Sequence, residues 1–307
     1  NRSEKDSFRI PRSVQQSIPI RRIFADGIWQ VGQKYSKTWR FSDINYAASS
    51  LDDRRSIFRS YGAVLNSLPT DATAKITIIN RRLNPVDFQR TMLMPECSDG
   101  QIILDKAAES NNLVQEKYIT LSIGLRKIEQ TRAYFRRVDT NLSASFGRLD
   151  SGAYTISCAD RLRLLHDFFR PGEEASFRFD LSANIKRGID FRDLICPDGL
   201  QFRAGYFEMG GKFGRVLFMR DYASFISDEM IKDLSDFSRN LLLSIDILPI
   251  PTEEAVREVQ SRILGVETDI TRWQQRQNRQ NNFTATVPYD LEQMRTESKD
   301  LLEDLTA

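Results

Sequence analysis

The spacing of apolar residues changes twice between residues 28 and 80, which restricts the fold to one that mixes strands with helices. GIWQV and KTWRF alternate aromatic or β-branched residues with polar ones, which predicts two short strands joined by a turn. Ser50 and Asp53 then have the spacing of a helix-capping pair. A 3.6-residue apolar period follows and predicts an amphipathic helix: Ile57, Phe58, Tyr61, Val64, Leu65 and Leu68. KITIIN, residues 75–80, predicts a strand that completes a ββαβ unit.

A second alternation of strands and helices occupies the middle of the chain. YITLSIGL predicts a strand, and a helical period then ends near Gly147: Ile128, Phe135, Val138 and Leu142. GAYTIS predicts the next strand, and residues 159–169 predict another helix. This order favours a mixed sheet with helices on one face.

Residues 200–248 repeat the opening pattern. LQFRAGYFEM and RVLFMRDY predict a hairpin around Gly210 and Gly211, Ser227 is expected to cap a short helix, and NLLLSIDIL predicts a strand. We therefore predict an α+β fold, with a mixed β-sheet built from an internally repeated ββαβ unit and flanking helices. The two copies are expected at about residues 28–170 and 198–250, within an α+β domain of residues 21–250.

Residues 251–307 have a different rhythm and predict a long C-terminal helical hairpin. Apolar residues alternate at spacings of three and four: Val256, Val259, Ile263, Val266, Ile270 and Trp273. The same rhythm returns after the break NNFTATVP. The seam fits either a protruding coiled-coil hairpin or two helices laid on the sheet, and Trp273 is a candidate interaction residue on it.

The chain offers little for catalysis. His166 is the one histidine; it lies beside the apolar stripe of DRLRLLHDFFR and is interpreted as a boundary residue. A single histidine excludes His-rich zinc sites. The run MGGKFG lacks the G-x-x-x-x-G-K-[ST] spacing of a phosphate loop and predicts a hairpin turn. Cys97, Cys158 and Cys196 are odd in number and far apart, which favours buried, reduced thiols in a cytosolic setting.

The formal net charge of +2 gives no global basic excess of the kind that announces nucleic-acid binding. Basic pairs recur and are interpreted mainly as solvated charges. Residues 126–187 hold somewhat more arginine than carboxylate, so Arg136 and Arg137 are candidates for a patch that faces phosphates or an acidic protein. The most apolar run, LLLSIDILPI, is about half the length of a membrane span.

The stretch FRIPRSVQQSIPI, residues 8–20, leads into the first strand. Pro11 and Pro19 bracket a polar run and forbid a continuous helix. Residues 1–20 are therefore expected to form an extended strap across the α+β body, anchored by the candidate interaction residues Val14, Ile18 and Ile20. The chain begins with asparagine and not methionine, so the gene product is expected to extend upstream.

Three stretches near the start carry a family resemblance: PRSVQQSIPI, DGIWQV and KTWRFSDINY. They resemble the beginning of the energising ATPases of conjugative type IV secretion systems, the TraC/TrbE-like family that includes the fourth VirB protein. They look most like versions from mobile elements of Gram-positive bacteria. NFTATVPYDLEQMRTESKDLLEDLT resembles the segment that precedes this family's motor domain, so the resemblance spans essentially the whole chain.

The resemblance implies a non-enzymatic N-terminal region. The family's nucleotide-binding motifs lie in a C-terminal RecA-like domain, and none occurs here, so no cofactor is expected in this fragment and ATP and Mg²⁺ belong to the motor domain. The implied role is assembly and docking, with inner-membrane secretion-system proteins, the chain's own ATPase domain and further copies of the protein as partners. The implied location is cytoplasmic, at the inner face of the cell membrane. A single-stranded nucleic-acid-binding module, using the Arg-rich middle and Phe146, is the alternative.

Overall fold

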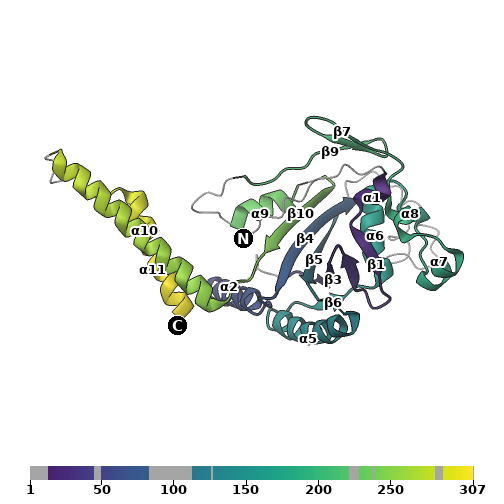
Figure 1. Ribbon diagram of the computed structural model, residues 1–307, viewed down its shortest axis with the longest axis horizontal. Helices are drawn as coiled ribbons and strands as arrows, with labels where there is room; N and C mark the ends of the chain where they lie inside the picture. Colours follow the sequence, from purple (N-terminus) through teal and green to yellow (C-terminus); the bar gives the residue numbers. More distant parts are fainter. Residues whose placement is uncertain are drawn as a thin grey trace. The chain divides into compact units, whose positions relative to one another are not determined.

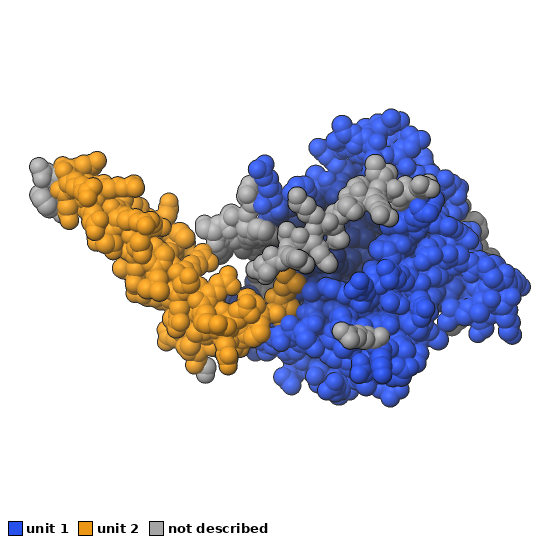
Figure 2. All heavy atoms as spheres, viewed as in Figure 1, with its two compact units in different colours: residues 1–247 blue, residues 248–307 orange. Residues whose placement is uncertain are grey.

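The computed structural model describes residues 13–44, 50–82, 113–125, 127–220, 228–237, 239–280 and 286–306. The chain divides into two compact units, residues 1–247 and residues 248–307 (Figure 2). Unit 1 contains all the described strands, and unit 2 contains two long helices.

Unit 1 is built around a seven-stranded sheet of order β1-β2-β3-β5-β4-β10, in which β6 also pairs with β3 (Figure 1). The α+β class is confirmed. Every pairing between the described strands is antiparallel, so the expectation of a mixed sheet is wrong. The strands of this sheet are β1 Ile20–Ile23, β2 Trp29–Val31, β3 Lys34–Phe41, β4 Ala72–Arg82, β5 Leu113–Ile123, β6 Ala153–Thr155 and β10 Leu241–Ile247.

The centre of the sheet has the connectivity of a split βαβ, or ferredoxin-like, fold. Along the chain the order is β3, α2 (Leu51–Asn66), β4, β5, α5 (Ile128–Gly147) and β6. In the sheet, β5 lies between β3 and β4, and β6 flanks β3. Both helices cover the same face and pack on each other (Figure 1).

Large apolar side chains fill the space between this face and the two helices. Trp39 of β3 lies directly opposite Ile119 of β5, so both point to the same side. The Trp39 and Phe135 ring centroids are 6.0 Å apart, which joins α5 to the sheet. The buried members of this core are Ile28, Tyr35, Trp39, Val64, Leu68, Ala72, Ala74, Ile119, Leu121, Ile123, Phe135, Val138, Leu142, Phe146, Leu149 and Ala153.

A charged pair lies within this apolar layer. The strand alternation points Lys37 of β3 toward the helices, where its Nζ atom lies 2.7 Å from Asp139 Oδ2 on α5. Trp39 Nε1 donates to the other carboxylate oxygen of Asp139 at 2.7 Å. One carboxylate therefore satisfies two donors that the sheet turns inward.

The helix α6 (Cys158–Phe169) lies on the opposite face, which corrects the expectation of helices on one face only. Ser36 points away from the side that Trp39 occupies, and its hydroxyl accepts from Arg161 of α6 at 2.8 Å. Ser157 caps α6 in a capping box with Asp160. The short helices that follow are a 3₁₀ turn Glu174–Ser176, α7 Leu181–Arg187 and α8 Phe191–Ile195.

The lead-in forms one helical turn, α1 (Val14–Ser17), where an extended strap was expected. Ser13 caps it by accepting from the Gln16 amide, and the turn ends at Ile18, whose extended backbone suits the residue before a proline. The proline argument excludes a long helix but not a single turn between the two prolines. Ile20 is buried, while residues 1–12 lie outside the described part of the chain.

The sequence order of the predicted repeat is present, but its two copies are built differently. β8 (Phe207–Met209), β9 (Lys212–Gly214), α9 (Asp228–Ser235) and β10 follow one another as β2, β3, α2 and β4 do. However, β8 and β9 join β7 (Leu200–Phe202) in a separate three-stranded sheet. The expected strand over residues 215–222 is wrong for residues 215–220, which form no strand; Ser227 lies outside the described residues.

The apolar stripe of α2 is narrower than predicted. Val64 and Leu68 are buried in the core, but Phe58 and Tyr61 are exposed. The helix begins as expected, since the Ser50 hydroxyl accepts from the Asp53 amide at 3.2 Å.

Unit 2 is the predicted helical hairpin. Its helices, α10 (Thr252–Arg279) and α11 (Tyr289–Thr306), pack on each other. Val259, Val266 and Ile270 of the heptad seam are buried, and Trp273 is half-buried. No helix among the described residues is long and apolar enough to cross a bilayer.

Candidate interaction surface

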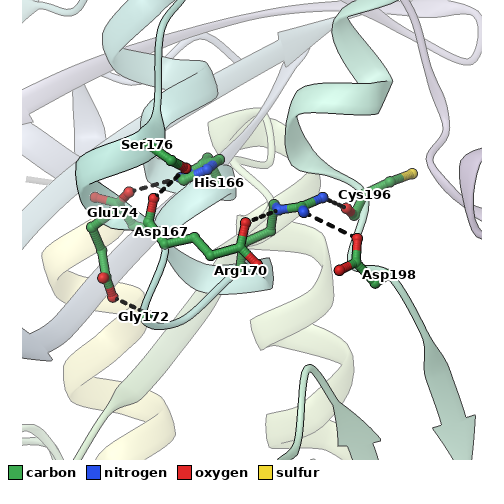
Figure 3. Close-up of polar contacts among 9 residues, drawn as sticks. His166, Asp167, Arg170, Gly172, Glu174, Ser176, Cys196 and Asp198 are labelled. Atoms are coloured by element: carbon green, nitrogen blue, oxygen red, sulfur yellow. Dashed lines mark hydrogen bonds and ion pairs between the residues drawn. The ribbon is translucent and has the colours of Figure 1, made fainter.

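The three-stranded sheet of unit 1 is tied to the end of α6 by Arg170 (Figure 3). Its guanidinium donates to the Cys196 carbonyl at 2.7 Å and to Asp198 Oδ1 at 3.0 Å. A third bond, 2.8 Å long, reaches Glu173 Oε2. The hydrogen bond to Glu173 is the main cause that raises the pKa of Arg170, so this side chain stays charged. Because Cys196 and Asp198 lie in the short segment before β7, Arg170 anchors the start of the small sheet.

A two-glycine turn shapes this sheet. Gly210 and Gly211 have φ values of +54° and +71°, as the tightest β-hairpin turns require, which confirms the predicted turn between β8 and β9. Phe207 lies opposite Gly214 across the pair, and a Cβ atom at Gly214 would come within 2.2 Å of the Phe207 ring. The aromatic ring therefore takes the space that a side chain at position 214 would fill.

Large apolar side chains cover this sheet and the segment after it without being buried. Phe213 exposes 73% and Phe218 82% of its surface, and Leu217 is similarly open. The Tyr206 and Phe213 rings meet edge to face, with centroids 5.7 Å apart. We call residues 200–220 the β7–β9 surface; its exposed large apolar side chains are Phe202, Tyr206, Phe213, Val216, Leu217, Phe218 and Met219.

Basic side chains accompany these apolar groups. Residues 200–220 contain the cations Arg203, Lys212, Arg215 and Arg220 and one carboxylate, Glu208. All four cationic residues are exposed. This surface therefore combines apolar side chains with positive charges. It is complementary to a partner that presents apolar groups beside carboxylates or phosphates.

The residues singled out in the sequence fall in separate places. Arg136 and Arg137 are exposed on α5, and Trp273 is half-buried on α10 of unit 2. Val14, Ile18 and Ile20 lie together, and they share a pocket with Leu200 of β7. The structure thus brings the lead-in next to the first strand of the β7–β9 surface.

Two other sequence interpretations are corrected. Phe146 is buried against Phe41, with ring centroids 5.2 Å apart, so it offers no stacking platform for a base. His166 is buried rather than at a boundary, and its Nδ1 atom lies 3.1 Å from Asp167 Oδ1 (Figure 3). The His166 and Phe177 ring centroids are 5.0 Å apart. Cys158 and Cys196 are buried thiols, as predicted, while Cys97 lies outside the described residues.

Sequence reasoning missed the β7–β9 surface because exposed aromatic residues have the same strand pattern as buried ones. One signal was present: Val216, Leu217, Phe218 and Met219 form an apolar run with no alternation, between Arg215 and Arg220. A half-buried strand would alternate, and a fully buried one needs cover on both faces.

The described residues contain no cluster of His, Cys, Asp and Glu side chains suited to a metal ion. Comparison of the sequence with protein-family models gives no match, and comparison with curated proteins gives none either.

Proposed function

We propose that this chain is the N-terminal assembly and docking domain of a conjugative type IV secretion ATPase, which links the motor to inner-membrane components during DNA transfer. The β7–β9 surface is the observation that carries this proposal. The resemblance of PRSVQQSIPI and KTWRFSDINY to that family supplies the identity of the system. The domain itself is non-enzymatic, and its location is the cytoplasmic face of the membrane.

The β7–β9 surface suits docking because its apolar side chains are unfavourable in water. Burying one fully exposed Phe or Leu side chain contributes about 1.5–3 kcal/mol. Burial of Phe213, Leu217 and Phe218 together would therefore contribute about 4.5–9 kcal/mol toward the entropy cost of association. The bonds of Arg170 to Cys196 and Asp198 hold the start of the surface in place, which lowers the cost of ordering it on binding.

A co-purification experiment tests the proposal. The triple substitution Phe213→Ser, Leu217→Ser and Phe218→Ser, made in the intact ATPase, should abolish co-purification with inner-membrane secretion proteins while leaving the fold intact. Phe58→Ser is the matched control, because Phe58 is an exposed phenylalanine on α2, outside the β7–β9 surface. Full co-purification of the triple variant would refute docking through this surface.

A single-stranded nucleic acid is the alternative partner, and one observation favours it. Phe202, Tyr206 and Phe213 are exposed beside Arg203 and Lys212, a pairing of aromatic and basic groups that suits base stacking and phosphate contact. Binding of an oligonucleotide would then weaken with salt, with a slope of about −0.7 per phosphate contact. Absence of binding at low salt would eliminate this alternative.

A further inference from the structure

An apolar pocket of about 320 Å³ lies between the lead-in, the first two strands and α6. This volume is at the small end of the range for small-molecule sites. The lining is almost entirely aliphatic or aromatic: Val14, Ser17, Ile18, Pro19, Ile20, Trp29, Val31, Arg161, Leu165, Phe169, Pro197 and Leu200.

One lining residue, Arg161, carries a buried positive charge. Its guanidinium lies 4.1 Å from the centre of the Trp29 ring, and only 9% of the residue is exposed. It donates to the Ser36 carbonyl at 3.0 Å, to the Ser36 hydroxyl at 2.8 Å and to the Gly27 carbonyl at 3.3 Å. All of these acceptors are neutral, and Arg161 forms no ion pair with a carboxylate in the described part of the chain.

This arrangement leaves a charge without a counter-ion in an apolar setting. Desolvation lowers the pKa of Arg161 to about 9, so the guanidinium is still charged at neutral pH. Buried charges are ordinarily paired, because an unpaired one is costly. Burial raises the pKa of the neighbouring Cys158 thiol, so this group stays neutral and supplies no counter-charge for Arg161.

We propose that this pocket binds a small molecule with an apolar chain and a carboxylate end, such as a medium-chain fatty acid. The carboxylate would pair with the Arg161 guanidinium, and the chain would contact Ile18, Leu165 and Phe169. Because Leu200 begins β7, a bound molecule would also touch the first strand of the β7–β9 surface. The proposal does not depend on the docking function.

Calorimetric titration of the whole chain with decanoate and with decan-1-ol tests it. The two probes share the chain length and differ in charge, so decanoate should bind about tenfold more tightly or better, a difference of about 1.4 kcal/mol or more. Arg161→Gln should remove this preference.

A second variant keeps the test decisive if Arg161→Gln does not fold. Leu165→Trp should fill the pocket and abolish decanoate binding without lowering the melting temperature. Leu51→Trp, on the exposed surface of α2, is the control and should bind like the wild-type chain. The proposal fails if decanoate does not bind, if decan-1-ol binds equally well, or if Leu165→Trp leaves the affinity unchanged.

Discussion

At the residue scale, the sheet tolerates a lysine on its covered face because the carboxylate of Asp139 forms an ion pair with it. Lys37 and Trp39 both donate to Asp139, which comes from α5 about a hundred positions later. The sequence around Lys37 and Trp39 gives no sign that Asp139 is their acceptor. By its position in an alternating strand, Lys37 would be predicted to be an ordinary surface residue. The pairing becomes visible only when α5 is placed over β3.

Replacing Asp139 by alanine should lower the free energy of unfolding by about 3 kcal/mol, because it leaves the Lys37 charge and the Trp39 donor without their acceptor. Urea denaturation followed by far-UV circular dichroism measures this loss. Asp246→Ala is the control: its ion pair with Lys75 is 3.3 Å long and exposed, and its loss should cost less than about 1 kcal/mol. Equal effects of the two substitutions would contradict the role given to Asp139.

At the element scale, helices with a clear apolar period were predictable and strand order was not. Phe135, Val138 and Leu142 set the period of α5, and all three are buried as expected. The insertion of β5 between β3 and β4 has no such local signal, because Trp39 meets Ile119 across eighty positions of sequence. The β7–β9 surface escaped prediction for a related reason, since whether an aromatic residue is exposed depends on what other segments cover it.

The seam of α10 and α11 gives a prediction for a single element pair. Trp273 is half-buried on α10, so Trp273→Ala should lower the local free energy of opening by about 2 kcal/mol, less than for a fully buried tryptophan. Amide hydrogen exchange of α10 reports this directly. Leu264→Ala, on the same helix but 65% exposed, should change the exchange little. Unchanged exchange in Trp273→Ala would show that this side chain does not hold the seam.

At the scale of the whole molecule, a well-packed split βαβ centre carries a small sheet whose apolar side chains lack cover. Its core is closed by Trp39, Ile119 and Phe135, whereas Phe213 and Phe218 remain in water. A chain that buries its aromatic residues in one place and exposes them in another is suited to assembly with a partner. The sequence predicted the α+β class, which the structure confirms; the docking role stays a proposal, and the β7–β9 surface is where we propose that docking occurs.

Site-specific photo-crosslinking in cells tests this account most directly. A benzoyl-phenylalanine introduced in place of Phe213 in the intact parent protein, which we propose to be a secretion ATPase, and another in place of Phe58, would report what each exposed position touches during assembly. The account predicts a crosslink from position 213 to an inner-membrane secretion protein and none from position 58. No protein crosslink from position 213, or the same crosslink from both positions, would contradict it.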